Sequence, residues 1–468
     1  MSGLDELVRE ELVALVIRLH ETVDTQERDI SELNSITHLQ AERITELEAE
    51  IARLRGGRPS AELCIKPSVA KKEKGPRKKR KHSFGRRALA ATQVVYHAVE
   101  ECPDCCRKLS GGSVKWRHQV KDIPPIKVDV TDHMFIERRC GVCGKRWTPD
   151  PGEVLSDVAL GKRSVGIGLM SLVAHLKTVC RVPIGQIQKL LNALLGARLS
   201  AGEIAEILHD VAQIGENEYD EILDRVRGSP VVHGDETGWR EDGRNGYLWT
   251  FCCPQARYYT YRHSRGSVVV KEVLGDEFVG ALVSDFYGAY NIYDGIKQRC
   301  WVHLLRDLKL LVEKNPDLPQ IAVWVERIAD VYHRAKETTE AKHRADERRQ
   351  LRQSFEDELL TLCMPYVGVK SAPQRVLSER IERFIEELLT FVQYPEVPSE
   401  NNAAERAIRP VVVARKISGG TRSEKGSKTS SVLRTLFETW ALQGRNTIDA
   451  CREMLTASAI NLPTTAQS

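Results

Sequence analysis

The stretch Pro230-Val-Val-His-Gly-Asp-Glu-Thr-Gly-Trp239 decides the fold, because it is a short apolar run that ends in two adjacent acids. Two more runs rich in aromatic and β-branched residues follow at 246–252 and 257–262, and each is typical of a β-strand. A helical pattern covers 267–274, and the next apolar run, Gly280-Ala-Leu-Val-Ser284, ends in Asp285. The sequence therefore predicts three strands, a helix and a fourth strand, with a carboxylate after the first and the fourth.

This element order favours an RNase H-like α/β core, in which strands one and four lie side by side. Asp235 and Asp285 are then expected to converge. A third acid is needed on a later helix, and Ser399–Arg409 offers both Glu400 and Glu405. On one helix these two side chains point about 140° apart, so only one can face the other acids. We predict that Glu405, on the polar side of the helix, is the third acid.

Three carboxylates in one place suit the cleavage of a phosphodiester bond. The reaction needs an activated water or 3′-hydroxyl and a stabilised leaving oxygen, and two Mg²⁺ (or Mn²⁺) ions about 3.5–4 Å apart supply both. Mg²⁺ prefers hard oxygen ligands and keeps several waters, so a few carboxylates suffice. The commoner role of any single acid here is to cap a turn or a helix, and for Glu405 this is a capping box with Asn402.

Composition places this core in a larger multi-domain α+β chain. The 468 residues are 41% hydrophobic and 29% charged, and no apolar run is long enough for a membrane span. We expect no signal peptide and a reducing compartment, the cytoplasm, where the protein associates with the nucleoid. The catalytic domain is expected at 228–447, with a helical insertion at about 313–395 and a C-terminal tail at 448–468.

Basic residues are concentrated in one segment near the N-terminus. Between Lys66 and Arg87 eleven Lys or Arg oppose one acid, Glu73, which gives a net charge of +10 and leaves −6 for the remaining chain. We predict that residues 58–90 form a disordered arm that contacts double-stranded DNA, although a solubilising linker is the alternative. The residues expected to bind phosphates in this arm are Lys78, Lys79, Arg80, Lys81, Arg86 and Arg87.

Residues 1–57 carry a heptad pattern. Isoleucine stands at position a and leucine at position d in three of four successive heptads: Ile30, Ile44 and Ile51, with Leu33, Leu47 and Leu54. Ile at a with Leu at d favours a parallel two-stranded coiled coil, so we expect a homo-oligomer, most simply a dimer. The polar Thr37 and Gln40 weaken this seam, and the alternative is an amphipathic helix docked on the protein's own core.

Two CxxC pairs predict a zinc ribbon over residues 91–155. Each pair directs two thiolates at one point, and two pairs complete a tetrahedral Zn²⁺ site, here Cys102, Cys105, Cys140 and Cys143. The stretch between the pairs is strand-like at 126–130 and 133–138. The alternatives are a redox-active cysteine pair and the use of Cys106 in place of Cys105.

A helical module is predicted at 156–227. Its periodicity indicates helices at 165–176, 184–195 and 201–214. Three short helices with tight turns suit a helix-turn-helix-like DNA-binding unit, and they suit a plain helical connector equally well.

Several motifs resemble the DDE transposases of the insertion-sequence sixty-six family. They are Asp235-Glu-Thr, Ser284-Asp-Phe-Tyr-Gly-Ala-Tyr290, Cys300-Trp-Val-His303 and Glu400-Asn-Asn-Ala-Ala-Glu-Arg-Ala-Ile-Arg-Pro410, followed by Arg415-Lys416. The resemblance covers nearly the whole chain, including the layout of the modules in front. It implies that Asp235, Asp285 and Glu405 bind magnesium and that the protein cuts and joins DNA. One departure is Glu400, where the family pattern has Asp.

The implied partners are transposon ends and target DNA, a second copy of the chain and accessory proteins of the same element. A structure-specific RNase H-like nuclease and a transposase-derived sequence-specific DNA-binding regulator are the alternatives. Four basic residues beside the third acid are expected to hold phosphates, or to form a solvated helix face: Arg406, Arg409, Arg415 and Lys416. Cys300 and His303 share a helix face and either bind a metal or, as we favour, pack beside the active site.

Overall fold

A computed structural model describes residues 89–123, 126–160 and 163–460 of the chain. The chain divides into two units, residues 1–121 and 122–468. The predicted coiled coil and all of the predicted basic arm except its last two residues lie outside the described residues. None of the helices in the described ranges combines the length and the apolar character that crossing a bilayer requires.

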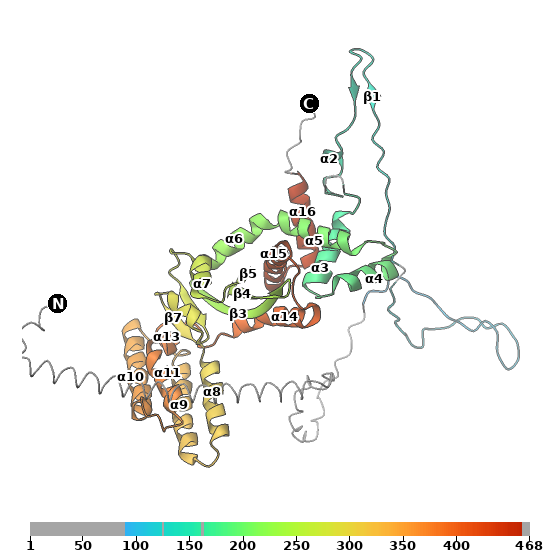
Figure 1. Ribbon diagram of the computed structural model, residues 1–468. Helices are drawn as coiled ribbons and strands as arrows, with labels where there is room; N and C mark the ends of the chain where they lie inside the picture. The colour runs from blue at the N-terminus through green and yellow to red at the C-terminus, as the bar shows by residue number, and fades with distance from the viewer. Residues whose placement is uncertain (1–88, 124–125, 161–162, 461–468) are drawn as a thin grey trace, which may run out of the picture. The chain divides into compact units, whose positions relative to one another are not determined.

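The second unit is built on a mixed five-stranded sheet (Figure 1). Strands β3 (Val231–Glu241), β4 (Arg244–Cys253) and β5 (Ala256–Arg262) are antiparallel neighbours, whereas β6 (Ala281–Ser284) and β7 (Lys297–Arg299) extend the sheet in parallel from β3. The order across the sheet is β5-β4-β3-β6-β7. The first and fourth predicted strands, β3 and β6, are therefore adjacent as expected. The three residues of β7 are too few to show alternation in the sequence.

The predicted helices around the sheet are present. The bounds of α4 (Ile184–Leu195), α5 (Ala201–Ile214) and α7 (Ser267–Leu274) equal the predicted ones, and α3 (Ile167–Thr178) is shifted by two residues. The unpredicted α6 (Glu216–Arg227) follows α5. Buried side chains of these helices share one hydrophobic core with the sheet, so the 156–227 segment packs as part of the central body.

Two C-terminal helices complete this core. The side of helix α15 (Glu424–Leu442) that faces the core is almost entirely buried. Helix α16 (Thr447–Ile460) packs on α3. The segment expected to be a tail from residue 448 is thus helical up to residue 460. Ala450, Cys451 and Leu455 are buried in the central core, which explains why it folds back onto the body.

Helix α15 also covers the edge strand β5. Three hydroxyl side chains spaced four residues apart accept hydrogen bonds from three β5 amides spaced two apart: Ser431 from Tyr261 (3.1 Å), Thr435 from Tyr259 (2.9 Å) and Thr439 from Arg257 (3.0 Å). The match is geometric, because four helical residues rise ~6 Å and two strand residues ~6.7 Å. The hydroxyls thereby satisfy edge amides that would otherwise be unpaired and open to other strands.

This arrangement predicts a contrast between two isosteric substitutions at fully buried threonines. Thr435→Val leaves the Tyr259 amide without its acceptor and is expected to lower the free energy of unfolding by about 1–3 kcal/mol. The Thr250 hydroxyl has no hydrogen-bond partner among the described residues, so Thr250→Val is expected to be neutral or stabilising. Urea denaturation of both variants measures this, and equal losses would contradict the role assigned to α15.

The helical insertion between the sheet and the third acid has its own core. It comprises α8 (Trp301–Lys314), α9 (Pro319–Glu337), α10 (Ala345–Cys363), α11 (Arg375–Arg383), α12 (Ile385–Leu388) and α13 (Thr390–Gln393). The insertion was expected from about residue 313, but helical packing already begins at Trp301, which is fully buried in this core. Figure 1 shows these helices grouped beyond the β7 edge of the sheet.

The strands predicted between the two CxxC pairs are wrong for the most part. Among the described residues between the pairs, the structure has only the two-residue strand β1 (Arg138–Arg139), which pairs with β2 (Arg146–Trp147) beyond Cys143, and the described residues at 126–137 lie in no strand. Side chains such as Val130 (87% exposed) and Met134 (83% exposed) have no sheet to pack on. Alternating sequence alone therefore does not produce a strand where pairing is missing.

Candidate active site

Asp235 lies inside the central strand, and not at the end of a strand as predicted. The parallel pairing of β3 with β6 ends at His233, whereas the antiparallel pairing with β4 continues to Glu241. Asp235 therefore lies two residues beyond His233, the last β3 residue that pairs with β6. Asp285 directly follows β6, which places both acids at the same end of that strand.

The electrostatics of Asp235 show that the other acids are close. Burial raises the pKa of Asp235 to about 7, and the negative charges of Glu236, Asp285 and Glu405 contribute to the rise. A hydrogen bond from the Glu236 N–H to Oδ1 of Asp235 (2.8 Å) opposes it. The three sequence-predicted acids therefore lie within range of one another's charges, although among the described residues their carboxylate oxygens do not all lie within 4.8 Å of one another.

The raised pKa of Asp235 predicts a pH-dependent gain in stability on its neutralisation. The native carboxyl binds its proton more tightly than the unfolded chain does, so wild-type stability falls as the pH rises from about 4 to about 7 and stays low above that. Metal-free Asp235→Asn is therefore expected to exceed the wild type at pH 8 by ~1–4 kcal/mol, and the difference should vanish near pH ~4. Urea denaturation in chelator at both pH values tests this; equal stabilities at pH 8 would contradict it.

Asp285 is held by its own turn and by a buried arginine. Its Oδ1 accepts the Tyr287 N–H (2.9 Å), and its main-chain carbonyl accepts a bond from the Arg299 guanidinium (2.8 Å). Arg299 is fully buried, bonds the Ser284 hydroxyl (3.1 Å) and pairs with Glu387 of the helical insertion. Arg299 was not among the site residues predicted from the sequence; the available signal was a charged residue within the short run Lys297–Arg299 that forms β7.

Glu236 has a separate set of partners. One carboxylate oxygen accepts the Tyr290 hydroxyl (2.8 Å), and the other pairs with Arg265 (2.8 Å), whose guanidinium lies 4.0 Å from the centre of the Tyr287 ring. Burial raises the pKa of Glu236, and the bonds from Tyr290 and Arg265 oppose that rise. Adjacent residues of a strand point to opposite faces, so Glu236 supports the aromatic side of the sheet rather than the Asp235 side.

Asn401 fixes the third acid relative to the sheet. It is 1% exposed, its Nδ2 donates to the Gly234 carbonyl (2.8 Å), and its Oδ1 lies 3.0 Å from His233 Nδ1. Its main-chain N–H donates to Cys300 Sγ (3.2 Å). The helix that carries Glu405 starts at the next residue, so Asn401 sets where that helix begins.

The start of this helix, α14 (Asn402–Ser418), corrects two expectations. Glu400 precedes the helix, so the angular comparison with Glu405 on a shared helix does not apply. Asn402 is the first helical residue and the N-cap is Asn401, with no side-chain capping bond. The capping-box role for Glu405 is therefore wrong, and its backbone N–H instead bonds the Asn401 carbonyl (3.1 Å).

Two neighbouring asparagines offer a matched test of this arrangement. Asn401→Ala leaves the Gly234 carbonyl and His233 without their partners in a buried place, and is expected to cost about 2–4 kcal/mol of stability. Asn402 makes no side-chain hydrogen bond within the described ranges, and Asn402→Ala is expected to change stability by less than about 0.5 kcal/mol. Thermal or urea denaturation distinguishes them, and similar values for the two would refute the positioning role.

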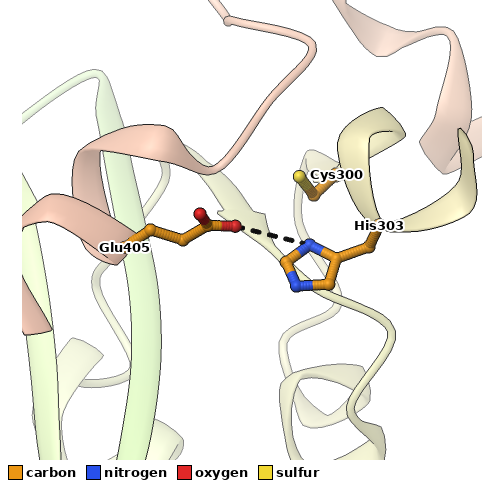
Figure 2. Close-up of side chains that lie close together, drawn as sticks. All are labelled: Cys300, His303 and Glu405. Atoms are coloured by element: carbon orange, nitrogen blue, oxygen red, sulfur yellow. Dashed lines mark ion pairs between the residues drawn. The ribbon is translucent and has the colours of Figure 1, made fainter. Parts of the chain in front are cut away.

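A second group of side chains lies beside Glu405. In the described part of residues 122–468, Cys300, His303 and Glu405 are the one set of three metal-binding side chains whose ligand atoms lie within 4.8 Å of one another. Figure 2 shows Cys300 and His303 on one helical turn, with the Glu405 carboxylate directed at the His303 ring. The His303 Nδ1 to Glu405 Oε1 distance is 3.7 Å. Burial raises the pKa of the Cys300 thiol, and the Glu405 charge adds to this.

The basic residues near the third acid differ in exposure. Arg406, Arg409 and Lys416 are exposed, whereas Arg415 turns inward and bonds the Thr237 hydroxyl (3.1 Å) and the Gly238 carbonyl. Arg415 also lines a cavity of about 410 Å³ together with Trp239 and Tyr247. The six predicted phosphate-binding residues of the arm, Lys78 to Arg87, lie outside the described residues.

The two CxxC pairs form matching turns, each within its own unit. In the first, the Cys102 N–H bonds the Arg107 carbonyl (2.9 Å) and its carbonyl accepts the Cys106 N–H (2.9 Å). In the second, Cys140 makes the same two bonds with Lys145 (2.8 Å) and Gly144 (3.0 Å). The pKa of the Cys102 thiol and that of the Cys140 thiol are both lowered, chiefly by backbone N–H groups within the turn.

The repeated turn explains Cys106. It has a positive φ of 54°, and the corresponding position of the second turn is Gly144 with a φ of 71°. This position closes the turn in a left-handed conformation, which favours glycine. Cys106 therefore occupies the closing position of the turn, and Cys102 and Cys105 are the counterparts of Cys140 and Cys143.

A buried aspartate with a raised pKa on the central strand of a mixed sheet, with further acids in range of its charge, marks a candidate enzyme active site. The chain belongs to the IS66 family of transposases. The family model described as "Transposase IS66 family" matches residues 162–429, which is more than half of the 468 residues. The matched range contains Asp235, Asp285 and Glu405, as well as the whole helical insertion.

Two proteins of Sinorhizobium fredii are also similar to this chain. The uncharacterized protein y4jO is 29% identical over 177 residues, which cover 37% of this chain and 51% of that protein. The uncharacterized protein y4qI is 27% identical over 278 residues, or 52% of this chain and 50% of that protein. The chain thus spans about half the length of the curated relatives it matches.

Proposed function

We propose that this protein is a DDE transposase that cuts DNA at the ends of an insertion sequence and joins the freed ends to a target. The family membership supports the class of reaction. The observation that carries the mechanism is that Asp235 and Asp285 lie at the same end of β6, with the charges of Asp285 and Glu405 both contributing to the raised pKa of Asp235. The strand order β5-β4-β3-β6-β7, with the first three antiparallel and the last two parallel to β3, supports an RNase H-like core.

The three acids fit divalent cations. They offer only hard oxygen ligands, as Mg²⁺ or Mn²⁺ prefers, and their mutual repulsion is unfavourable until positive charge is added. Asp235, Asp285 and Glu405 would hold two such ions. When bound, the ions lower the pKa of the attacking water or 3′-hydroxyl and stabilise the leaving oxygen.

The chain's own residues prepare this site. Asn401 places the start of α14 against β3 and so brings Glu405 to Asp235. Arg299 fixes the main chain of Asp285 from behind. Near pH 7 the Asp235 carboxyl is only partly ionised, and a cation binds to its ionised form. Because protonation competes with cation binding, activity should fall as the pH drops below about 7.

The DNA itself is held by basic residues outside the acid cluster. Exposed Arg406, Arg409 and Lys416 on α14, together with the arm at 58–90, contact phosphates of transposon ends and target. The four cysteines Cys102, Cys105, Cys140 and Cys143 hold one structural Zn²⁺, as their matching turns and lowered thiol pKa values support. Residues 1–57 join two copies, and the protein acts on DNA of the nucleoid, with or without accessory proteins of the element.

A pair of glutamate variants tests the third acid and with it the enzyme class. Glu405→Gln keeps the size of the side chain but removes one charge from the cluster, so we expect loss of Mg²⁺-dependent cleavage by at least about a hundredfold with DNA binding retained. Glu400→Gln, outside the helix, is expected to remain active. The assay is cleavage and strand transfer on DNA that carries the element's ends.

Three results would contradict the proposal. Wild-type cleavage by Glu405→Gln, or loss of cleavage in a folded Glu400→Gln, would reassign the third acid. Cleavage without strand transfer by the wild type would indicate a nuclease. Specific binding of the ends without cleavage would indicate a DNA-binding regulator.

A further inference from the structure

We propose that Cys300, His303 and Glu405 form a site for one thiophilic divalent cation of the zinc class, and that occupation of this site inhibits DNA cleavage. The inference rests on the proposed function in one respect, because Glu405 is shared with the catalytic acids. The site itself is argued from its own geometry and chemistry.

The geometry suits a tetrahedral ion. The sulfur, nitrogen and oxygen ligand atoms lie within 4.8 Å of one another, and the nitrogen and oxygen are 3.7 Å apart. Ligands of zinc at about 2.0–2.3 Å from the metal are separated by about 3.5 Å, so small side-chain shifts bring all three into range. Figure 2 shows the three side chains converging from two elements, α8 and α14.

The donor set selects against magnesium. A thiolate, an imidazole and a carboxylate are common zinc ligands, whereas magnesium sites are built from oxygen. His303 Nδ1 is buried and has no hydrogen-bond partner within the described ranges, which is unusual for a polar atom in a protein interior. A metal ion bound to Nδ1 would satisfy that atom.

The surroundings of the sulfur are those of a metal ligand. Cys300 is fully buried at the N-cap of α8, and burial raises the pKa of its thiol, whereas the helix dipole and the backbone N–H groups of Asn401 and His303 favour the thiolate. Its sulfur accepts the Asn401 N–H at 3.2 Å, an outer contact of the kind that orients metal-binding thiolates. Asn401 also positions α14, so the same residue prepares both sites that use Glu405.

The consequence is competition for one carboxylate. A Glu405 carboxylate bound to an ion at Cys300 and His303 is not free to bind an ion held by Asp235 and Asp285. Nitrogen and sulfur ligands bind zinc far more tightly than magnesium, so zinc should act at concentrations well below those of magnesium. Zinc availability would then set the fraction of protein able to cut DNA.

Metal content of the full-length protein tests the site directly. After equilibrium dialysis against zinc, the wild type is expected to retain one zinc equivalent more than Cys300→Ser or His303→Gln. Cys363→Ser, at another fully buried cysteine in α10, is the matched control and should retain the wild-type amount. Circular dichroism verifies that each variant is folded. Equal zinc content in the wild type and both site variants would overturn the proposal.

Cleavage in magnesium with added zinc tests the inhibition. At a zinc concentration that lowers the wild-type rate about tenfold, His303→Gln should lose less than about twofold of its own zinc-free rate. Equal relative inhibition would overturn the regulatory role even if zinc binds. If the wild type does not cleave DNA at all, the proposed function fails, while the zinc content still decides whether the site exists.

Discussion

The hydrogen bonds of Asn401 join three segments that are far apart in the chain. Its side chain is bonded to the central strand at His233 and Gly234, and its main chain to Cys300 at the start of α8. The neighbouring Ser399 carbonyl accepts the Trp301 N–H (3.0 Å), which ties the same two segments a second time. Without these bonds the helix of Glu405 has no fixed position relative to the acids on the sheet, because the whole helical insertion separates them in sequence.

The rest of the second unit keeps that position stable. On one side, α14 buries Ala404, Ala407 and Val411 against the antiparallel strands. On the other, α15 satisfies the edge amides of β5 and belongs to the central core. The insertion is anchored at β7, where Gln298 bonds the Leu388 carbonyl (3.1 Å) and the Phe391 N–H (3.0 Å). These packing and hydrogen-bonding interactions therefore stabilise the fold against the repulsion between the clustered carboxylates.

The sequence allowed prediction of the features that depend on local pattern. The bounds of α4, α5 and α7, the run of strands and the adjacency of β3 and β6 follow from periodicity and element order. The motifs Asp-Glu-Thr and Ser-Asp-Phe and the Asn-Asn-x-x-Glu cluster led to Asp235, Asp285 and Glu405, and the charges of Asp285 and Glu405 contribute to the raised pKa of Asp235. These signals are strong because burial imposes regular spacing on the chain.

Features that depend on distant contacts were not predicted. Arg299 and Asn401 look like ordinary polar residues, and their roles appear only when β6, α8 and α14 meet. Helix α15 shows little amphipathic contrast because most of its residues from Ser431 to Trp440 are buried. The opposite error occurred at 126–137, where alternating residues suggested strands, but the described residues of this segment pair with no other strand.

The most direct measurement of the central claim is the position of bound Mn²⁺ in crystals of the protein, located by anomalous diffraction. The account predicts manganese between the carboxylates of Asp235, Asp285 and Glu405, with the Asn401 contacts to β3 unchanged. Manganese held without Asp235, or by Glu400 in place of Glu405, would contradict it.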